Sequence, residues 1–419
     1  MTFFKQYGLS ASLLALLHSS PLHAAPNEVD VTGLLPTEFV QSLFEQDPAV
    51  AAARAGLGVS EQDSKLVIRS PYEWTATFSS QKRKMNVGGG DYQEWSASLE
   101  RPLRLPTKIG VDKRIGQAIL DQGDAQYGEA VHETARLLLT LWLDWLQAKQ
   151  GTVLVALHQQ AAQKNMELVA TRLQAGDASQ LDLGLAQGEA AEQQRAENDG
   201  KLAEALAWAK LHARFPSMTK EFSVLPSVRP LTLEANFLRQ RITDQSDELK
   251  IAKTAWQEAQ SVGDRMRADR VPDPTVGIFS ASEFGGAERV VGISVSIPIP
   301  GSQRSAHAAR AVQASEMTRQ EFELVRREVE STVANGLVNT EGTYASWESA
   351  ETGAAAMQNN SVLMQRAYAL GEADLQSLLS ARRLATAASQ TALVAKVSAV
   401  RAYYSILIDA HLVWGLEHQ

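Results

Sequence analysis

Four short stretches of the chain alternate between apolar and polar residues. Successive side chains of a β-strand point to opposite faces, so this alternation predicts strands with one apolar and one polar face. Glycine-rich segments, Gly88–Gly90 and Gly285–Gly286, mark the loops inside two strand pairs. The predicted strands lie at about 72–80, 93–101, 275–282 and 289–297, and the third has the weakest pattern.

Long runs without proline follow each predicted strand pair and predict long helices. From about Lys108 to Ala175 the chain has no proline and little glycine. At about 1.5 Å per residue, such a helix would be roughly 100 Å long. Helices of this length are typical of coiled coils and helical tubes rather than of ordinary globular domains. The four-residue spacing of a packed helical seam recurs in the second run at Val325, Val329, Val333 and Leu337.

The chain carries signs of an internal duplication. Pro102 and Pro298, at the exits of the two strand pairs, are 196 residues apart, and the glycines of two similar helix turns, Gly176 and Gly371, are 195 residues apart. These nearly equal offsets predict two repeats, each with a helix (about 47–67 in the first), two strands and a long helical hairpin. Chance similarity between alanine-rich helices is the alternative. The predicted repeats cover 25–225 and 226–419.

The N-terminus has the three parts of a secretory signal. Lys5 supplies a positive start, Leu9–Leu17 is an apolar core too short to span a bilayer, and Ala24 fits a signal-peptidase site before Pro26. We therefore predict that residues 1–24 are removed on export. A buried N-terminal helix is the alternative, which the polar segment before Pro26 disfavours.

Composition and motifs exclude several classes of function. The net charge of −8 gives no reason to expect nucleic acid as a partner. The sequence has no cysteine, which excludes disulfides and thiolate metal sites. It has no His-Glu-x-x-His, Gly-x-Ser-x-Gly or phosphate-binding glycine loop, and after the signal no histidine has another three or four positions away. We predict no enzyme activity, no cofactor and no metal site.

A membrane role would need a β-barrel. Beyond the signal no segment has about 20 consecutive apolar residues, and the nearest, 137–146, carries Asp144 and predicts a helix packed against other helices. A closed barrel needs at least about eight strands. Open strand edges are not tolerated in lipid, so four strands per chain predict pooling between copies, and a trimer would contribute twelve. A small soluble sheet is the alternative, and Tyr72, Trp74 and Trp95 suit either an interfacial aromatic belt or a core.

Several motifs in a fixed order resemble the TolC family of outer-membrane efflux proteins over nearly all of the mature sequence. They are Arg270–Pro274 before the third strand, Ser296–Pro298 before the long helix, Tyr368–Leu375 at the last helix turn, and the closing Tyr403-Tyr404 helix. The resemblance implies a mainly α-helical homotrimer with a shared 12-stranded barrel in the Gram-negative outer membrane and an α-barrel in the periplasm. Pro272-Asp273-Pro274 and Asp409–His411 favour the metal-cation (CzcC-like) efflux branch.

The function that the resemblance implies is passive conduction in a tripartite efflux system. An inner-membrane pump, expected to be of the RND type, and a periplasmic adaptor protein would dock at the far end of the helical tube. The family places acidic residues of the periplasmic helix turns at the pore constriction, which points to Asp177, Asp182, Glu372 and Asp374. Helix capping is the alternative, except for Asp182, which we place beyond the capping position. Three copies of Asp182 would form an anionic ring.

Other residues near the turns and loops have candidate roles. Gly176 and Gly371 suit the left-handed conformation at a helix end. Leu181, Leu183, Leu375 and Leu378 are candidate adaptor contacts, with intramolecular packing as the alternative. Lys82–Lys84 is predicted in the first strand-to-strand loop, either solvated or against lipopolysaccharide.

Two other protein classes compete with the channel. A periplasmic coiled-coil adaptor would have one helical hairpin and β-rich domains, whereas two hairpins and two strand pairs are predicted here. An exported hydrolase or binding protein would need a site constellation that the sequence lacks.

Overall fold

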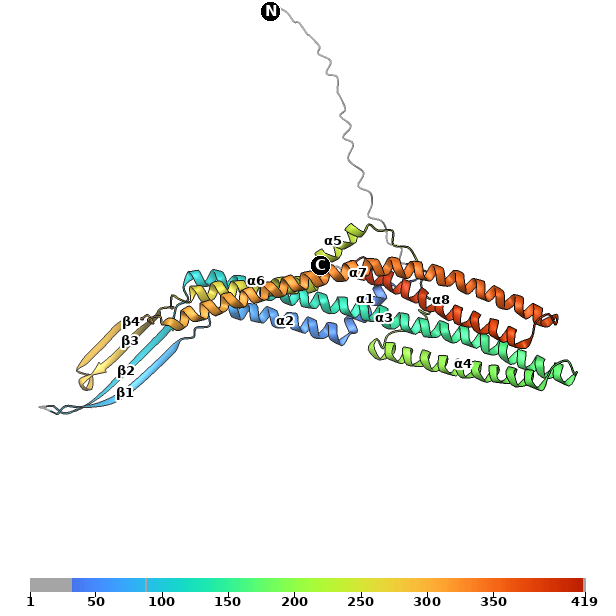
Figure 1. Ribbon diagram of the computed structural model, residues 1–419. Helices are drawn as coiled ribbons and strands as arrows, with labels where there is room; N and C mark the ends of the chain where they lie inside the picture. Colours follow the sequence, from blue (N-terminus) through green and yellow to red (C-terminus); the bar gives the residue numbers. More distant parts are fainter. Residues whose placement is uncertain (1–31, 87–88, 417–419) are drawn as a thin grey trace, which may run out of the picture. The chain divides into compact units, whose positions relative to one another are not determined.

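The computed structural model describes residues 32–86 and 89–416, so the predicted signal at 1–24 lies outside the described residues. The first half contains α1 (Thr37–Gln46), α2 (Pro48–Ile68), β1 (Thr75–Lys84), β2 (Asp91–Pro102), α3 (Pro106–Gln174) and α4 (Gln180–Arg214). The second half contains α5 (Ala235–Gln245), α6 (Asp247–Ala268), β3 (Thr275–Glu283), the 3-10 turn η1 (Phe284–Gly286), β4 (Glu288–Ser296), α7 (Ser302–Ala369) and α8 (Leu375–Asp409). These elements are shown in Figure 1.

Two very long helices organise the helical part. Helix α3 has 69 residues and α7 has 68, which confirms the long helices expected from the proline-free runs. Each turns back into a 35-residue helix, α4 or α8, and packs along it. Nearer the sheet, α2 and α6 lie beside α3, and α6 also contacts α7 (Figure 1). The long helices therefore belong to two successive helix bundles.

The core of the helical part lies where α3 meets the other helices. Trp142 and Trp145 are fully buried on α3, and Trp142 Nε1 donates to the Phe222 carbonyl at 2.9 Å. The segment 137–146 is thus a packed helix, as its length and charge predicted. Asp144, at the edge of this segment, pairs with Arg401 at 2.6 Å. Helix α8 is long and apolar enough to cross a membrane by composition, but 56% of its apolar window is buried inside the protein.

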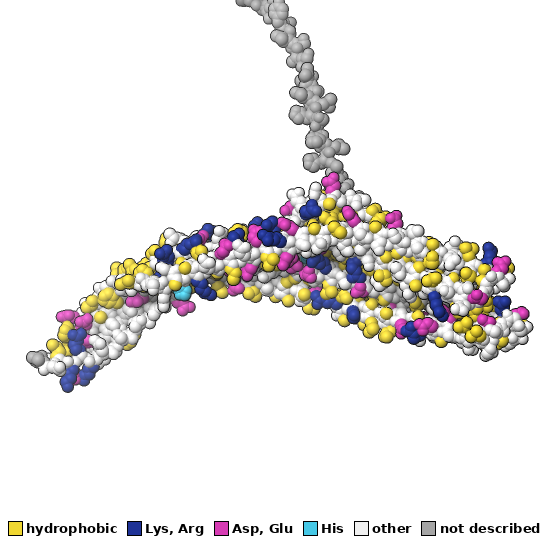
Figure 2. Space-filling view, viewed as in Figure 1, with side chains coloured by type: hydrophobic (Ala, Val, Ile, Leu, Met, Phe, Trp, Pro, Cys, Tyr) yellow, Lys and Arg dark blue, Asp and Glu magenta, His cyan; other side chains and the backbone are white. Residues whose placement is uncertain are grey.

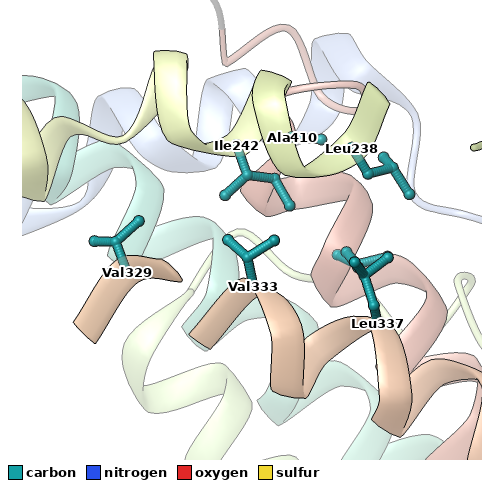
Figure 3. Packing of buried hydrophobic residues seen from close by; sticks show 7 residues of the cluster. Leu238, Ile242, Val329, Val333, Leu337 and Ala410 are labelled. Carbon is teal, nitrogen blue, oxygen red and sulfur yellow. The ribbon is translucent and has the colours of Figure 1, made fainter. Parts of the chain in front are cut away.

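A second cluster confirms the four-residue seam on α7. Val329, Val333 and Leu337 are buried under α5, and Val325 is partly buried beside them. Figure 3 shows these side chains facing Leu238 and Ile242 of α5, with Ala410 close by. The seam therefore fixes α5 across α7 and the end of α8. The other members of the cluster are Leu238, Ile242, Ile406 and Ala410.

The four strands form one antiparallel sheet in the order β1-β2-β3-β4. The predicted strands are confirmed, with one correction. Strand β1 begins at Thr75 and continues to Lys84, so Lys82–Lys84 lie in a strand rather than in a loop. Two of the three charges are paired across the sheet, since Lys82 contacts Asp91 at 2.6 Å and Arg83 contacts Glu94 at 2.9 Å.

Candidate membrane sheet and helix tips

One face of the sheet is apolar and uncovered. The strand register places Ala76, Leu99, Ile278 and Ile293 in one row, and Phe78, Ala97, Ser280 and Val291 in the next. Phe78 is 71% exposed and Val291 is 80% exposed. Among the described residues no helix packs on this face, and in Figure 2 hydrophobic side chains lie on the surface over the strands. An exposed apolar surface of this kind is typical of contact with lipid or with another protein.

The opposite face of the same sheet is polar over β1 and β2. Its rows contain serine, threonine and glutamate side chains from all parts of β1 and β2. The Ser79 and Ser96 hydroxyls lie 2.8 Å apart, and Gln81 Nε2 donates to Glu94 Oε2 at 2.8 Å. Alternation of an apolar outer face with a polar inner face is the pattern of strands in outer-membrane barrels.

Both edges of the sheet are open within the described part of the chain. Strand β1 pairs only with β2, and β4 pairs only with β3. Each outer edge therefore presents unpaired backbone N–H and C=O groups, which are a template for pairing with another strand. In lipid these groups would have to be satisfied by a neighbouring chain.

Buried charges join the sheet to the helices. Lys108, in the first turn of α3, is 1% exposed, and its Nζ lies 3.0 Å from Asp269 Oδ1 and 2.9 Å from Asp273 Oδ1. Asp273 also accepts hydrogen bonds from the Tyr72 hydroxyl at 2.5 Å and from the Leu105 N–H at 3.0 Å. Tyr72 therefore contributes its hydroxyl to this network. We call these residues, with Arg104, Asp112 and Arg265, the junction network.

The rest of the junction network ties α2, α3 and α6 together. Arg104 contacts Asp112 at 2.7 Å, and Arg265 Nε donates to the other oxygen of Asp112 at 2.7 Å. Burial opposes ionisation of Asp273, but hydrogen bonds from Tyr72 and Lys108 outweigh it and hold its pKa below the ordinary value. Burial and the hydrogen bond to Asp273 raise the pKa of Tyr72 to about 12. Tyr72 is therefore a stable donor at neutral pH.

Each of the two long helices, α3 and α7, ends in a turn of the same kind at the end far from the sheet. Gly176 has φ +83° and Gly371 has φ +77°, so both glycines adopt the left-handed conformation expected of them. Asp177 N–H donates to the Arg172 carbonyl, and Glu372 N–H donates to the Ala367 carbonyl. In each turn the glycine N–H also donates to a carbonyl one residue further along the helix, that of Leu173 or Tyr368. The two hydrogen bonds together form a Schellman motif at each tip.

The acidic residues of the tips have different local roles. Asp182 is the third helical residue of α4 and forms a capping box with Ser179, whose N–H donates to Asp182 Oδ2 at 2.9 Å. Our placement of Asp182 beyond the capping position was therefore wrong. Hydrogen bonds from Ser179 also lower its pKa. Asp374 is the N-cap of α8 and accepts from Ser377 N–H at 2.7 Å. Asp177, Glu372 and Asp374 are all exposed.

No protein-family model matches the chain, and no curated protein matches it in sequence. Solved structures do match its fold. The VceC outer membrane protein of Vibrio cholerae superimposes with TM-score 0.73 at 14% identity, covering 90% of this chain and 96% of that one. The CmeC outer membrane channel of Campylobacter jejuni gives 0.73 at 12% identity, covering 91% and 85%. The open state of the MtrE outer membrane channel of Neisseria gonorrhoeae gives 0.69 at 15% identity, covering 91% and 89%.

The chain has the fold of an outer-membrane channel. The resemblance to the TolC family predicted this fold for nearly the whole mature sequence, and the structural comparison confirms it.

The leucines near the tips of the channel fold differ in exposure. Leu375 and Leu378 are buried against Val169 and Tyr368, so their side chains pack inside the chain, which was the alternative to adaptor contact. Leu183 is partly buried against the same cluster. Leu181 is 72% exposed and is the one of the four whose side chain is available to a partner.

Sequence spacing missed a group of residues that the channel fold brings together. His132 of α3 and His411, just after α8, lie with ring centroids 5.2 Å apart, although 279 positions separate them. Glu129 and Glu133 flank His132 on α3, and their ligand atoms lie within 4.8 Å of one another. The Glu-x-x-His-Glu pattern at 129–133 is a signal in the sequence that could have indicated this group.

Proposed function

We propose that the chain is the outer-membrane channel subunit of an efflux system. The observation that carries this proposal is a sheet with an exposed apolar face, a polar opposite face and two open edges. Lipid would cover the apolar face, water would fill the space beside the polar face, and pairing with other copies would satisfy the edges.

The open edges require partners of the same kind. Three copies would bring β1 of one chain beside β4 of the next and close about twelve strands, which exceeds the minimum of about eight for a barrel with a lumen. A cyclic trimer with such a heterologous contact closes on itself and leaves no edge. We therefore infer a homotrimer, exported by the N-terminal signal to the Gram-negative outer membrane. The paired strands and hairpins of the two halves are consistent with an internal duplication.

The helices extend the conduit away from the membrane. Helix α3, with 69 residues, is roughly 100 Å long at about 1.5 Å per residue. A tube of this length would cross much of the periplasm and bring the tips to an adaptor protein and an inner-membrane pump of the RND type. At the tips, Asp177, Asp182, Glu372 and Asp374 would form anionic rings that favour cations. Leu181 is the exposed leucine that would meet the adaptor.

Reconstitution tests the channel directly. In cells, the mature protein should fractionate with the outer membrane. After purification, it should crosslink as a trimer and give discrete ionic currents in planar bilayers. A periplasmic adaptor would instead fractionate away from the outer membrane and carry no current. Absence of both the trimer and the current, in protein whose far-UV circular dichroism shows the helices and the sheet, would refute the proposal.

A further inference from the structure

Three side chains on one face of α3 have the chemistry of metal ligands. Glu129, His132 and Glu133 occupy positions i, i+3 and i+4, which are neighbours on a helix surface. Their potential ligand atoms lie within 4.8 Å of one another. Imidazole nitrogen and carboxylate oxygen are ligands that zinc and neighbouring divalent transition metals accept.

A carboxylate from another helix completes the group. Asp409 ends α8, and its Oδ1 lies 3.6 Å from His132 Nε2. That separation is too long for a hydrogen bond. Two ligands bonded to one tetrahedral zinc ion at about 2.0–2.1 Å lie about 3.3 Å apart, so the observed separation is close to what a shared ion requires.

His132 itself is buried with an unsatisfied ring nitrogen. The residue is 9% exposed, and Nε2 makes no hydrogen bond. Most buried polar atoms of side chains have a hydrogen-bond partner. A buried ring nitrogen without one calls for an explanation such as an ion or a water. The His411 ring packs near the His132 ring, at a centroid distance of 5.2 Å.

A cavity of about 110 Å³ adjoins the group between α3, α6, α7 and α8. Glu129, His132 and Asp409 line it together with Asp247 and Glu248 of α6. The cavity is large enough for a water molecule, which needs about 10–15 Å³ of accessible volume.

The charges around the cavity favour a cation. Four carboxylates, those of Glu129, Asp247, Glu248 and Asp409, line it. Arg136 offsets part of this negative charge, because it contacts Glu133 at 3.0 Å and Asp409 Oδ1 at 2.9 Å. Each carboxylate oxygen has two lone pairs, so Asp409 can accept from Arg136 and still bind a metal ion.

We propose that Glu129, His132 and Glu133 of α3, with Asp409 of α8, bind one divalent transition-metal ion of the zinc class. The ion would join the middle of α3 to the C-terminal end of α8. It would be a resident structural ion rather than cargo, because His132 and Asp409 are largely buried, while Glu133 is the exposed ligand. This site does not depend on the channel proposal.

Titration of the metal-free full-length protein in detergent with Zn²⁺ alone tests the site. We expect one ion per chain, and Co²⁺ in its place should give the visible absorption of a low-coordinate site with nitrogen and oxygen ligands. His132→Gln should weaken binding by about 100-fold or more, since even outer-shell changes cost 10–100-fold. Glu129→Gln, which keeps the side-chain shape, should weaken it by at least about tenfold.

Matched controls separate this site from scattered surface binding. His158→Gln removes another histidine of α3, and Glu316→Gln removes an exposed carboxylate of α7. Both should bind Zn²⁺ as the unmodified protein does. Absence of a one-to-one site in the unmodified protein, or equal affinity in folded His132→Gln and Glu129→Gln proteins, would overturn the proposal. Neither result would affect the conductance test of the channel.

Discussion

Lys108 offers a direct test of whether the junction network holds the helices to the sheet. Its buried ammonium contacts both Asp269 and Asp273. Lys108→Met keeps most of the apolar stem and removes the charge, so two carboxylates lose the same cation. Removing one partner of a buried ion pair typically costs about 3–5 kcal/mol.

The lower end of this range applies to Lys108. Asp273 would keep its hydrogen bonds from Tyr72 and Leu105, and Asp269 would keep its contact with Arg265. We therefore expect the free energy of unfolding to fall by about 3 kcal/mol. Guanidinium unfolding in detergent, followed by far-UV circular dichroism, measures this loss. Lys113→Met, at an exposed lysine of the same helix, should change the stability by less than about 0.5 kcal/mol.

The pH dependence gives a second measure of the same contact. The folded-state pKa of Asp273 lies below its ordinary value of 3.8. A carboxyl group of this kind contributes stability that is fully present above the unfolded-state pKa and is lost as the pH falls through the folded-state pKa. The unmodified protein should therefore lose stability below about pH 4, and Lys108→Met should lose less over that range. Equal stability of the two lysine variants at pH 7, with unchanged acid slopes, would refute the reasoning.

Three other predictions concern the sheet face and the tips. Val291→Arg places a charge on the apolar face and should cost about 2–4 kcal/mol in membrane stability. Val290→Arg, one position away on the polar face, should assemble normally, and similar trimer yields for the two would contradict the lipid assignment. Asp182→Ala should reduce the cation preference of single-channel current, whereas Ser179→Ala should cost about 1 kcal/mol as a lost cap but keep that preference. Unchanged selectivity in Asp182→Ala leaves only the capping role. Gly371→Ala, at φ +77°, should lower the stability by about 1 kcal/mol in thermal unfolding, and no change would mean that the turn relaxes.

Local patterns predicted the elements of this fold well, because their causes are local. Period-two alternation identified the strands, and the absence of proline identified α3 within a few residues of its observed bounds. The left-handed conformation of Gly176 and Gly371 was predicted from their position at a helix end, and their positive φ angles confirm it. The error at Lys82–Lys84 has a simple origin. Three consecutive cations predict a loop when the sequence is considered locally. In the folded chain, carboxylates of β2 lie opposite Lys82 and Arg83 and pair with them within the sheet.

Contacts between distant segments could not be predicted in this way. Lys108 and Asp273 are 165 positions apart, and nothing in either neighbourhood indicates that a lysine so early in a helix is buried. His132 and His411 are further apart still, so a search for closely spaced ligands could not indicate that these two rings lie together where α3 packs on α8. The prediction that Asp182 lies beyond the capping position was wrong for a different reason. The start of α4 depends on Ser179, and a one-turn error in that start turns a capping residue into an interior one.

The distribution of polar and apolar groups divides this chain into parts with different requirements for stability. The helices bury Trp142, Trp145 and the seam on α7 within one chain, so their packing needs no partner. The sheet buries neither its apolar face nor its edges within the described residues. Within the described residues its stability therefore comes from the strand pairings and from the junction network. The junction network lies between these two parts, and its buried ion pairs have a defined geometry that apolar packing would not impose. It can therefore hold the four strands at a fixed angle to the helices within a single chain.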